Sequence, residues 1–389
     1  MKLSLGTLTV GAFGIGMTEF VMMGILPDLS AAFQVTIPQA GYLISAYALG
    51  VVVGAPLLVA WLGTSPPKRI LIGLMIMFTL GNGLSAISPN YGMMLVMRFI
   101  SGLPHGAFFG VGAVVATRLA EPGREARAIS VMFAGLTIAN IIGVPLGTYL
   151  GHQFGWQTTF AAVAVVGVLA ILSIHQWMPV LAPTEGASFK RDVAVFKRRE
   201  PWLIAGITMI GTGGFFCWYS YIAPLMMEVG KFSEDALVYV LMIAGVGMAC
   251  GNFIGGRLAD RSPLKATYTL LIAMAVVLVV LTFAVYYKPT ALVMTFITGG
   301  AAFALASPLQ MLMIRASRGA EMLASAVIQG AFNIGNALGA FLGGLPIAAG
   351  YGFTSPEWVG ASMALCGLAI ALAAGREQTR QREAQLEVQ

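Results

Sequence analysis

Long apolar runs, each about as long as a membrane-spanning helix, follow one another along the whole chain. A helix that crosses the hydrocarbon core of a bilayer needs about 20 mostly apolar residues. Short polar segments separate the runs, so the pattern predicts an all-α integral membrane protein with twelve transmembrane helices. The expected spans are 5–27, 40–62, 70–88, 91–117, 128–151, 159–181, 202–227, 237–259, 266–287, 290–314, 322–349 and 357–375.

The longest polar interruption divides the predicted spans into two sets of six. An offset of 197 residues aligns Gly50 and Gly54 in the second span with Gly247 and Gly251 in the eighth. Two parallel halves, related by an axis along the membrane normal, are typical of secondary transporters. We therefore expect two pseudo-symmetric six-helix bundles, over 1–181 and 201–375, joined by a central loop over 182–200 and followed by a polar tail over 376–389.

Composition supports this prediction and excludes a water-soluble domain. Hydrophobic residues make up 58% of the 389 residues, and charged residues make up only 10%. Soluble domains carry about 25% charged residues. The mean hydropathy of +0.84 agrees, because so few polar side chains cannot cover a surface that faces water.

The net charge of +6 indicates orientation in a membrane rather than binding to nucleic acid. Nearly all of the 22 Lys and Arg residues fall on one side of the predicted spans. Lys231 and Lys288 lie in the opposite loops, and Arg98 lies inside a span. By the positive-inside rule, both termini and the central loop are expected to face the cytoplasm.

Three stretches have the form of transporter motifs: GGRLADRSPLK (255–265), RFISGLPHGAFFG (98–110) and ANIIGVPLGTYLG (139–151). Together they resemble the major facilitator superfamily, and within it the twelve-span drug:proton antiporters. EFVMMGILPDL, SAYALGVVVGAP and GLPHGAFFGVGA resemble more closely the arabinose- or sugar-efflux-type permeases. The residues that match the family's cytoplasmic loop motif and its fifth-span antiporter motif are Gly256, Asp260, Arg261 and Lys265, and Gly143, Pro145 and Gly147.

The chain departs from the family pattern in both motifs. Val144 is inserted before Pro145, and Thr148 stands in the last glycine place of the antiporter motif. Gly63 stands where the repeat places Asp260, so the first-half loop lacks the family's usual acidic latch. We therefore assign no gating role to residues 60–67.

The resemblance implies a proton-coupled antiporter of a bacterial inner membrane that exports small sugars or related amphipathic compounds by alternating access. A broad-specificity multidrug:proton exporter is the alternative. A membrane-embedded enzyme or a non-transporting sensor is a remote third, because the sequence has no nucleotide-binding loop, metal cluster or Ser/His/Asp set. We expect no enzyme activity, no metal and no cofactor beyond the proton gradient. The partners expected are a small-molecule substrate and the lipid bilayer, with no nucleic acid, and the two-half architecture needs no second subunit.

Three ionisable residues inside the predicted spans are the candidates for proton coupling: Glu19, Arg98 and His105. A charged side chain at the centre of a bilayer costs about 2.5 kcal/mol or more, and such residues are usually functional. At about 1.5 Å per residue, Glu19 and Arg98 both lie roughly 10–12 Å from the outer surface, so they can pair directly or through water. His105 lies two turns beyond Arg98 on nearly the same face. Purely structural roles remain open, with Glu19 only holding Arg98 and His105 only bonding between helices.

Aromatic and amide side chains are the candidates for the substrate cavity. Phe215, Trp218 and Tyr221 lie in GTGGFFCWYSYIAP (211–224), where rings with polar groups can stack on a sugar or a flat drug. Gln329, Asn333 and Asn336 share one helical face, and Asn140 and Gln310 add further neutral amides. The aromatic residues can instead form an interfacial belt. The amides can instead hold helices together.

Overall fold

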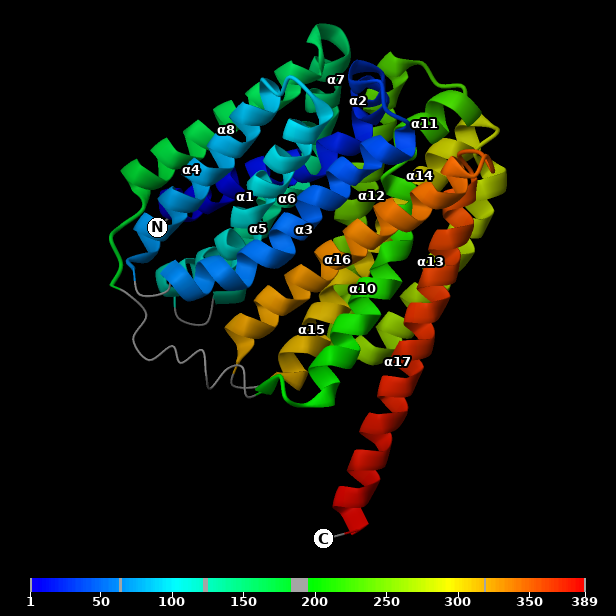
Figure 1. Ribbon diagram of the computed structural model, residues 1–389. Coiled ribbons are helices and arrows are strands. Elements are labelled where there is room, and N and C mark those ends of the chain that lie inside the picture. The colour runs from blue at the N-terminus through cyan, green and yellow to red at the C-terminus, as the bar shows by residue number, and fades with distance from the viewer. Residues whose placement is uncertain (1, 63–64, 122–124, 183–194, 318–319, 388–389) are drawn as a thin grey trace.

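The computed structural model describes residues 2–62, 65–121, 125–182, 195–317 and 320–387. Every regular element in these ranges is a helix, and twelve helical segments are long and apolar enough to cross a membrane. These segments overlap the twelve predicted spans, so the prediction of an all-α membrane protein is confirmed. Figure 1 shows the helices of the first half (blue to green) lying beside those of the second half (green to red).

The first half contains six spanning segments and one short additional helix. Its elements are α1 (Lys2–Gly24), α2 (Leu26–Phe33), α3 (Ile37–Leu62), α4 (Pro67–Ala86), α5 (Tyr91–Leu119), α6 (Glu125–Ile138), the π-helical turn η1 (Ala139–Gly143), α7 (Val144–Phe154) and α8 (Trp156–Trp177).

The second half begins at α10 and ends in a long C-terminal helix. Its elements are α10 (Arg199–Tyr219), α11 (Ile222–Pro224), the π-helical turn η2 (Leu225–Val229), α12 (Glu234–Arg261), α13 (Pro263–Ala284), α14 (Lys288–Ala304), α15 (Ala306–Ala316), α16 (Glu321–Ala348) and α17 (Ser355–Glu387). The predicted polar tail therefore continues the last helix as far as Glu387. Most of the predicted central loop, residues 183–194, lies outside the described residues.

Several predicted spans are interrupted near prolines. Proline lacks an N–H group, and its ring collides with the carbonyl of residue i−4 in a continuous α-helix. Pro27 accordingly lies in the first turn of α2, after α1 has ended at Gly24. The fifth span turns π-helical directly before Pro145, and the seventh does so directly after Pro224. Short π-helical turns of this kind are frequent at functional sites.

The same glycine contacts occur in both halves, where α3 packs on α5 and α12 packs on α14. A Cβ atom at Gly50 or Gly54 would overlap the carbonyl oxygens of Phe99 and Leu103, respectively. The equivalent overlaps in the second half are Gly247 with Phe296 and Gly251 with Gly300. Both members of each contact are related by the same offset of 197 residues. The repeat seen in the sequence is therefore a repeat of helix packing.

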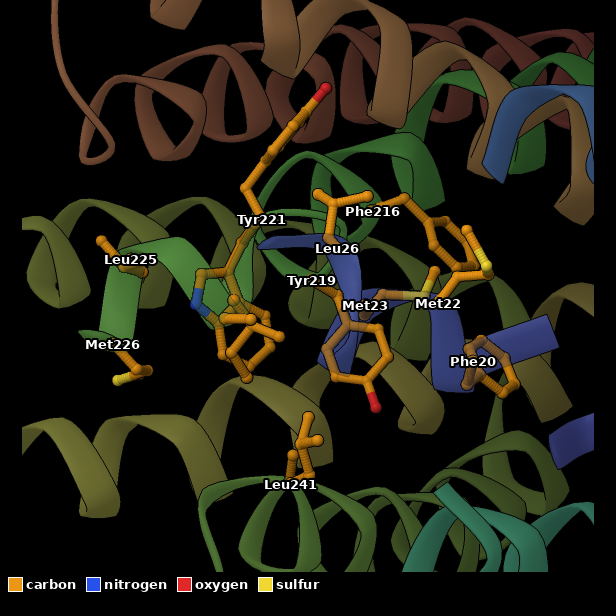
Figure 2. Close-up of a cluster of buried hydrophobic side chains, with 14 of the residues drawn as sticks. Phe20, Met22, Met23, Leu26, Phe216, Tyr219, Tyr221, Leu225, Met226 and Leu241 are labelled. Atoms are coloured by element: carbon orange, nitrogen blue, oxygen red, sulfur yellow. The ribbon is translucent and has the colours of Figure 1, made fainter. Parts of the chain in front are cut away.

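The two halves meet near the end of the molecule that carries α2 and α11, which we call the distal end (top of Figure 1). Ser45 donates a hydrogen bond from α3 to the carbonyl of Ala337 in α16 at 3.1 Å. Gln153 at the end of α7 donates to Asp235 in α12 at 3.2 Å. Figure 2 shows α1 side chains, among them Met22 and Met23, packed with side chains of α10 to α12 in one apolar cluster.

The distal parts of the two central helices are enclosed on every side. Residues 14–26 of α1 and its continuation are all buried, as are residues 211–226 of α10 and its continuation. Nearer the chain termini, Leu5 and Val10 of α1 and Leu203 and Met209 of α10 are only partly buried. The described residues of α1 and α10 are therefore more tightly enclosed at the distal end than at the opposite end.

Candidate functional site

Arg98 is the centre of a buried polar network in the first half. Its side chain on α5 is fully buried, and its Nη1 donates a hydrogen bond to the hydroxyl of Thr18 on α1 at 3.0 Å. Its Nε donates to the carbonyl of Leu43 on α3 at 3.5 Å. The guanidinium carbon lies 4.4 Å from the ring centroid of Tyr47, a cation–π geometry that stabilises a desolvated cation. Three helices therefore hold one positive charge in place.

The hydroxyl of Thr18 connects this charge to a fourth helix. It accepts from Arg98 and donates to the amide oxygen of Asn82 on α4 at 2.5 Å. The amide nitrogen of Asn82 donates in turn to the carbonyl of Phe78 at 2.9 Å. Each group in this series donates in one direction only. The series of hydrogen bonds therefore fixes the orientation of the Arg98 guanidinium. The Nη2 of Arg98 has no hydrogen-bond partner among the described residues.

His105 joins the network through Tyr47. The hydroxyl of Tyr47 lies 3.1 Å from Nδ1 of His105, and both side chains are almost fully buried. A neutral imidazole with an unprotonated Nδ1 accepts from the tyrosine, whereas an imidazolium donates to it. Protonation of a ring whose Nδ1 is the acceptor therefore reverses one hydrogen bond beside Arg98.

Glu19 lies next to Thr18 on α1 and is 6% exposed. Among the described residues, it makes no direct ion pair with Arg98, although the two groups are close enough for their charges to interact. Tyr47 lies within the same electrostatic range of Glu19. From the second half, the amide of Asn336 approaches the carboxyl group without completing a hydrogen bond. Glu19 is thus placed where the charge network of one half meets the other half.

An aromatic cluster lies beside this network and includes two of the three predicted aromatic residues. The ring of Phe215 stacks on Tyr219 at 5.0 Å and makes an edge contact with Trp218 at 5.8 Å. Phe20, the neighbour of Glu19, contacts Tyr219 at 6.0 Å. The indole nitrogen of Trp218 and the hydroxyl of Tyr219 are buried without partners among the described residues.

Tyr221, the third predicted aromatic residue, has a different environment. Its hydroxyl donates to the carbonyl of Ala340 in α16. Figure 2 shows the hydroxyl groups of Tyr219 and Tyr221 pointing in opposite directions. Tyr221 therefore ties α16 to the end of α10, while the hydroxyl of Tyr219 bonds to no other described residue.

The predicted amides divide into two groups. Asn140, Asn333 and Asn336 are buried, and each has at least one amide atom without a hydrogen-bond partner in the described part of the chain. Gln310 and Gln329 are only partly buried, and the amide of Gln310 donates to Ser325 at 3.3 Å. The buried amides with unpartnered atoms are therefore the ones that could form hydrogen bonds to a polar ligand.

The glycines of the fifth-span motif pack closely, whereas the glycine of the cytoplasmic loop motif has open space and the charged residues of that motif are exposed. A Cβ at Gly143 would press on the ring of Phe13, and one at Gly147 would press on Val21. Gly256 has open space around it. Asp260, Arg261 and Lys265 are exposed at the junction of α12 and α13, and Asp260 has no ion-pair partner among the described residues. Gly63, which marks the missing latch, lies outside the described residues.

Sequence reasoning missed several members of the site. Tyr47 lies in the quoted SAYALGVVVGAP stretch and is a polar group in the middle of a span, which was the available signal. Thr18 and Asn82 gave no such signal, because small polar residues are common in membrane helices. Outside the Arg98 network, Glu357 is a buried carboxyl group in the first turn of α17 that gave little signal, because it stands at the end of a predicted span. The described residues contain no group of three or more His, Cys, Asp or Glu side chains that could hold a metal ion.

Comparison with known proteins places this architecture in a family. The family model described as "Major Facilitator Superfamily" matches residues 8–321. The chain belongs to the major facilitator superfamily. Like its relatives in this family, it is a multi-pass membrane transporter and not an enzyme.

Three bacterial relatives cover most of the chain. The "Inner membrane transport protein YdhP" of Escherichia coli (strain K12) is 40% identical over 371 residues, which are 95% of this chain and 95% of that protein. The "Chloramphenicol resistance protein" of Streptomyces lividans is 28% identical over 379 residues, covering 95% and 96% of the two chains. The "Probable sugar efflux transporter" of Mannheimia succiniciproducens is 29% identical over 333 residues, covering 85% and 84%.

A solved structure shares the fold at low sequence identity. It is the crystal structure of a bacterial homologue of the human lysosomal transporter Spinster, in an inward-facing and occupied conformation. Its TM-score is 0.76 at 17% identity, and the match covers 96% of each chain. The likeness confirms the two-bundle fold.

Proposed function

We propose that this transporter is a proton-coupled antiporter that exports small sugars or related amphipathic compounds. One observation carries the proposal: a buried carboxyl group, Glu19, lies beside a fixed cation and makes no direct ion pair with it. A carboxylate placed only to neutralise Arg98 would form that pair, because burial makes a direct contact worth more than in water. A carboxyl group left free can bind and release a proton.

The network supports a division of roles. Arg98 stays positively charged, since arginine does not lose its proton in proteins. It stabilises the ionised form of Glu19 through space, and its bonds to Thr18 and Leu43 hold it in position. His105, which is hydrogen-bonded to Tyr47 next to the same cation, would be a second proton-binding group. Proton binding at Glu19 leaves the site with a net positive charge, whereas proton release makes it neutral.

Competition at Glu19 then couples proton to substrate. An ionised carboxylate accepts hydrogen bonds from a substrate hydroxyl, whereas a protonated one loses part of this capacity. Asn336 approaches Glu19 from the other half, so the surroundings of Glu19 would change when the two halves move apart. Alternating access by rocking of the two halves fits tight glycine contacts within each half and the π-helical turn before Pro145.

The free polar groups support a neutral, hydroxylated substrate with an apolar part. Trp218, Tyr219, Asn333 and Asn336 offer unpartnered donors and acceptors, and none of them is charged. Phe20, Phe215 and Tyr219 offer ring faces beside them. Leaving buried polar groups unpaired costs about 1–3 kcal/mol each, so a ligand that pairs them is favoured.

Charge and burial support a proposal for the orientation and the working state. The positive-inside rule places the end with the termini and the exposed Arg261 and Lys265 in the cytoplasm. The distal end, where α1 and α10 are enclosed on every side, is then the outer side. We propose that this structure is closed to the outside, that the boundaries of the two bundles are those predicted, and that one chain is the working unit. A proton gradient would be its energy source, with no cofactor.

A test uses purified protein in liposomes that contain a pH-sensitive dye. Arabinose, short arabinosides and cationic dyes are added under an imposed proton gradient, to the parent protein, Glu19→Gln and His105→Ala. Glu228→Gln, which changes an exposed carboxyl group in η2, is the matched control. We expect substrate-dependent proton flux in the parent and control, and its loss in Glu19→Gln. Full proton-driven transport by Glu19→Gln would remove Glu19 from the mechanism.

A broad-specificity drug exporter is the second candidate. The aromatic cluster and the similarity to a protein named for chloramphenicol resistance favour it. The same liposomes distinguish the two, because adding chloramphenicol and arabinosides separately shows which compound drives proton flux. Flux with chloramphenicol and cationic dyes but not with arabinosides would favour the drug exporter.

A further inference from the structure

A pocket outside the transport site lies where the described chain enters the second half, at the start of α10. Its volume is about 270 Å³. One water molecule occupies about 30 Å³ in the liquid, so the pocket can hold a group of several heavy atoms. It is lined by Phe196, Lys197, Arg198, Arg199, Trp202 and Leu203.

The pocket is strongly positive. Lys197, Arg198 and Arg199 are consecutive and exposed, and none of them forms an ion pair with another described residue. Glu200, the acidic residue that follows them, does not line the pocket. Three cations that have no ion-pair partner in the described ranges surround one hollow, which favours an anion, and arginine binds phosphate oxygens through two parallel hydrogen bonds.

The aromatic wall of the pocket is fixed by the protein itself. The indole nitrogen of Trp202 donates to the carbonyl of Phe196 at 2.7 Å, and the two rings meet edge to face at 6.1 Å. Trp202 is nevertheless 55% exposed, in the first turn of a membrane-spanning segment. Tryptophan is enriched at the level of lipid headgroups, where one side of the ring faces acyl chains and the other faces water.

We propose that this pocket binds the phosphate headgroup of an anionic phospholipid. The three cations would contact the phosphate, and Trp202 and Leu203 would contact the glycerol and the first part of the acyl chains. A free phosphate ion shares only the first of these contacts. The position at the end of a spanning helix therefore favours a lipid over a soluble anion. Basic pockets beside transmembrane helices on the cytoplasmic side are suited to such headgroups.

The consequence concerns α10, which begins at this pocket and carries Phe215, Trp218 and Tyr219 further along. A bound lipid would hold the start of α10 at the membrane surface. The inference is independent of the transported substrate and of proton coupling, because it is tested by lipid binding alone.

The test measures binding of dioctanoyl phosphatidylglycerol to the full-length protein in detergent by native mass spectrometry. Dioctanoyl phosphatidylcholine is the neutral lipid, and inorganic phosphate is the soluble anion. The variant Lys197→Gln/Arg198→Gln/Arg199→Gln is compared with the control Lys68→Gln/Arg257→Gln/Arg376→Gln, which removes the same charge elsewhere. Trp202→Leu tests the aromatic wall. Size-exclusion profiles check that every variant is folded.

We expect phosphatidylglycerol to bind at a saturable site, with affinity roughly tenfold or more weaker in the pocket variant and unchanged in the control, because only the pocket variant loses the cations that contact the phosphate. Weaker binding by Trp202→Leu would support the lipid contact. Equal loss in the pocket and control variants would overturn the proposal, because only total charge would then matter. Inorganic phosphate binding as tightly as phosphatidylglycerol would also overturn it.

Discussion

The two halves share a framework and differ in chemistry. The offset of 197 residues that aligns the glycine contacts also pairs Arg98 with Thr295, and His105 with Ala302. Thr295 is buried like Arg98, but its hydroxyl donates to the carbonyl of Ala291 within its own helix at 2.8 Å. The helix packing is therefore satisfied without a charge at this position. The charges of the first half are an addition to the fold, and their cost in a membrane points to function.

The glycine contacts are the part that the halves have in common, and breaking them has the largest expected effect. Gly54→Leu and Gly251→Leu each force a side chain onto a backbone carbonyl, at Leu103 and Gly300 respectively. We expect both to lose folded protein, since overpacking costs about 1–3 kcal/mol or more and backbone cannot move aside easily. The yield of monodisperse protein in size-exclusion chromatography measures this. Gly73→Leu, in α4 with open space around it, should fold normally.

If only one of the two glycine variants were damaged, the halves would not share a framework in the way that the structure indicates. Equal damage from Gly73→Leu would mean that the loss came from the larger side chain itself and not from the contact.

Substitutions at the paired positions Arg98 and Thr295 sharpen the comparison. Arg98→Gln leaves the Thr18 hydroxyl without its donor and Glu19 without its cation, so we expect a loss of about 1–3 kcal/mol in stability and loss of proton-coupled transport. Thr295→Val removes only a bond within one helix and should keep transport. Thermal unfolding and dye-reported proton flux measure the two effects. Retained transport in Arg98→Gln would show that the charge is structural only.

A smaller change compares two buried tyrosine hydroxyls, one in each half. Tyr47→Phe removes the bond to His105 and keeps the ring under Arg98, while Tyr221→Phe removes the bond to Ala340. Each should cost about 0.5–1.5 kcal/mol in stability. Only Tyr47→Phe should change the dependence of transport rate on pH. Identical pH profiles for the parent and both variants would exclude Tyr47 from proton movement.

The smallest effect is expected at the buried carboxyl group of the second half. Glu357 lies in the first turn of α17, where the helix dipole favours a negative charge, and its Oε2 has no partner among the described residues. No hydrogen bond or ion pair joins it to the Arg98 network in the described part of the chain, so Glu357→Gln should keep proton-coupled transport where Glu19→Gln loses it. Loss of proton flux in Glu357→Gln, with normal unfolding temperature, would place a proton site in the second half as well.

The sequence by itself determined the fold class, the twelve spans and the repeat. The length of an apolar run is a property of a local segment. Inside a membrane, a helix is one of the few structures that satisfy the hydrogen-bonding groups of the backbone. It also singled out Glu19, Arg98 and His105, because any ionisable residue in an apolar run is conspicuous. The sequence is less informative about the breaks near Pro27 and Pro224 and about the π-helical turn before Pro145. A proline limits a helix without determining the conformation of the residues around it.

Only the tertiary structure decided which groups meet. Spacing placed Glu19 and Arg98 at one depth, but the rotation of α1 brings Thr18, and not Glu19, into direct contact with Arg98. Tyr47 joins Arg98 to His105 because α3 packs closely against α5 through Gly50 and Gly54, a contact between segments some fifty residues apart. A polar partner depends on helix rotation and packing across the whole bundle, and neither is a property of any one segment.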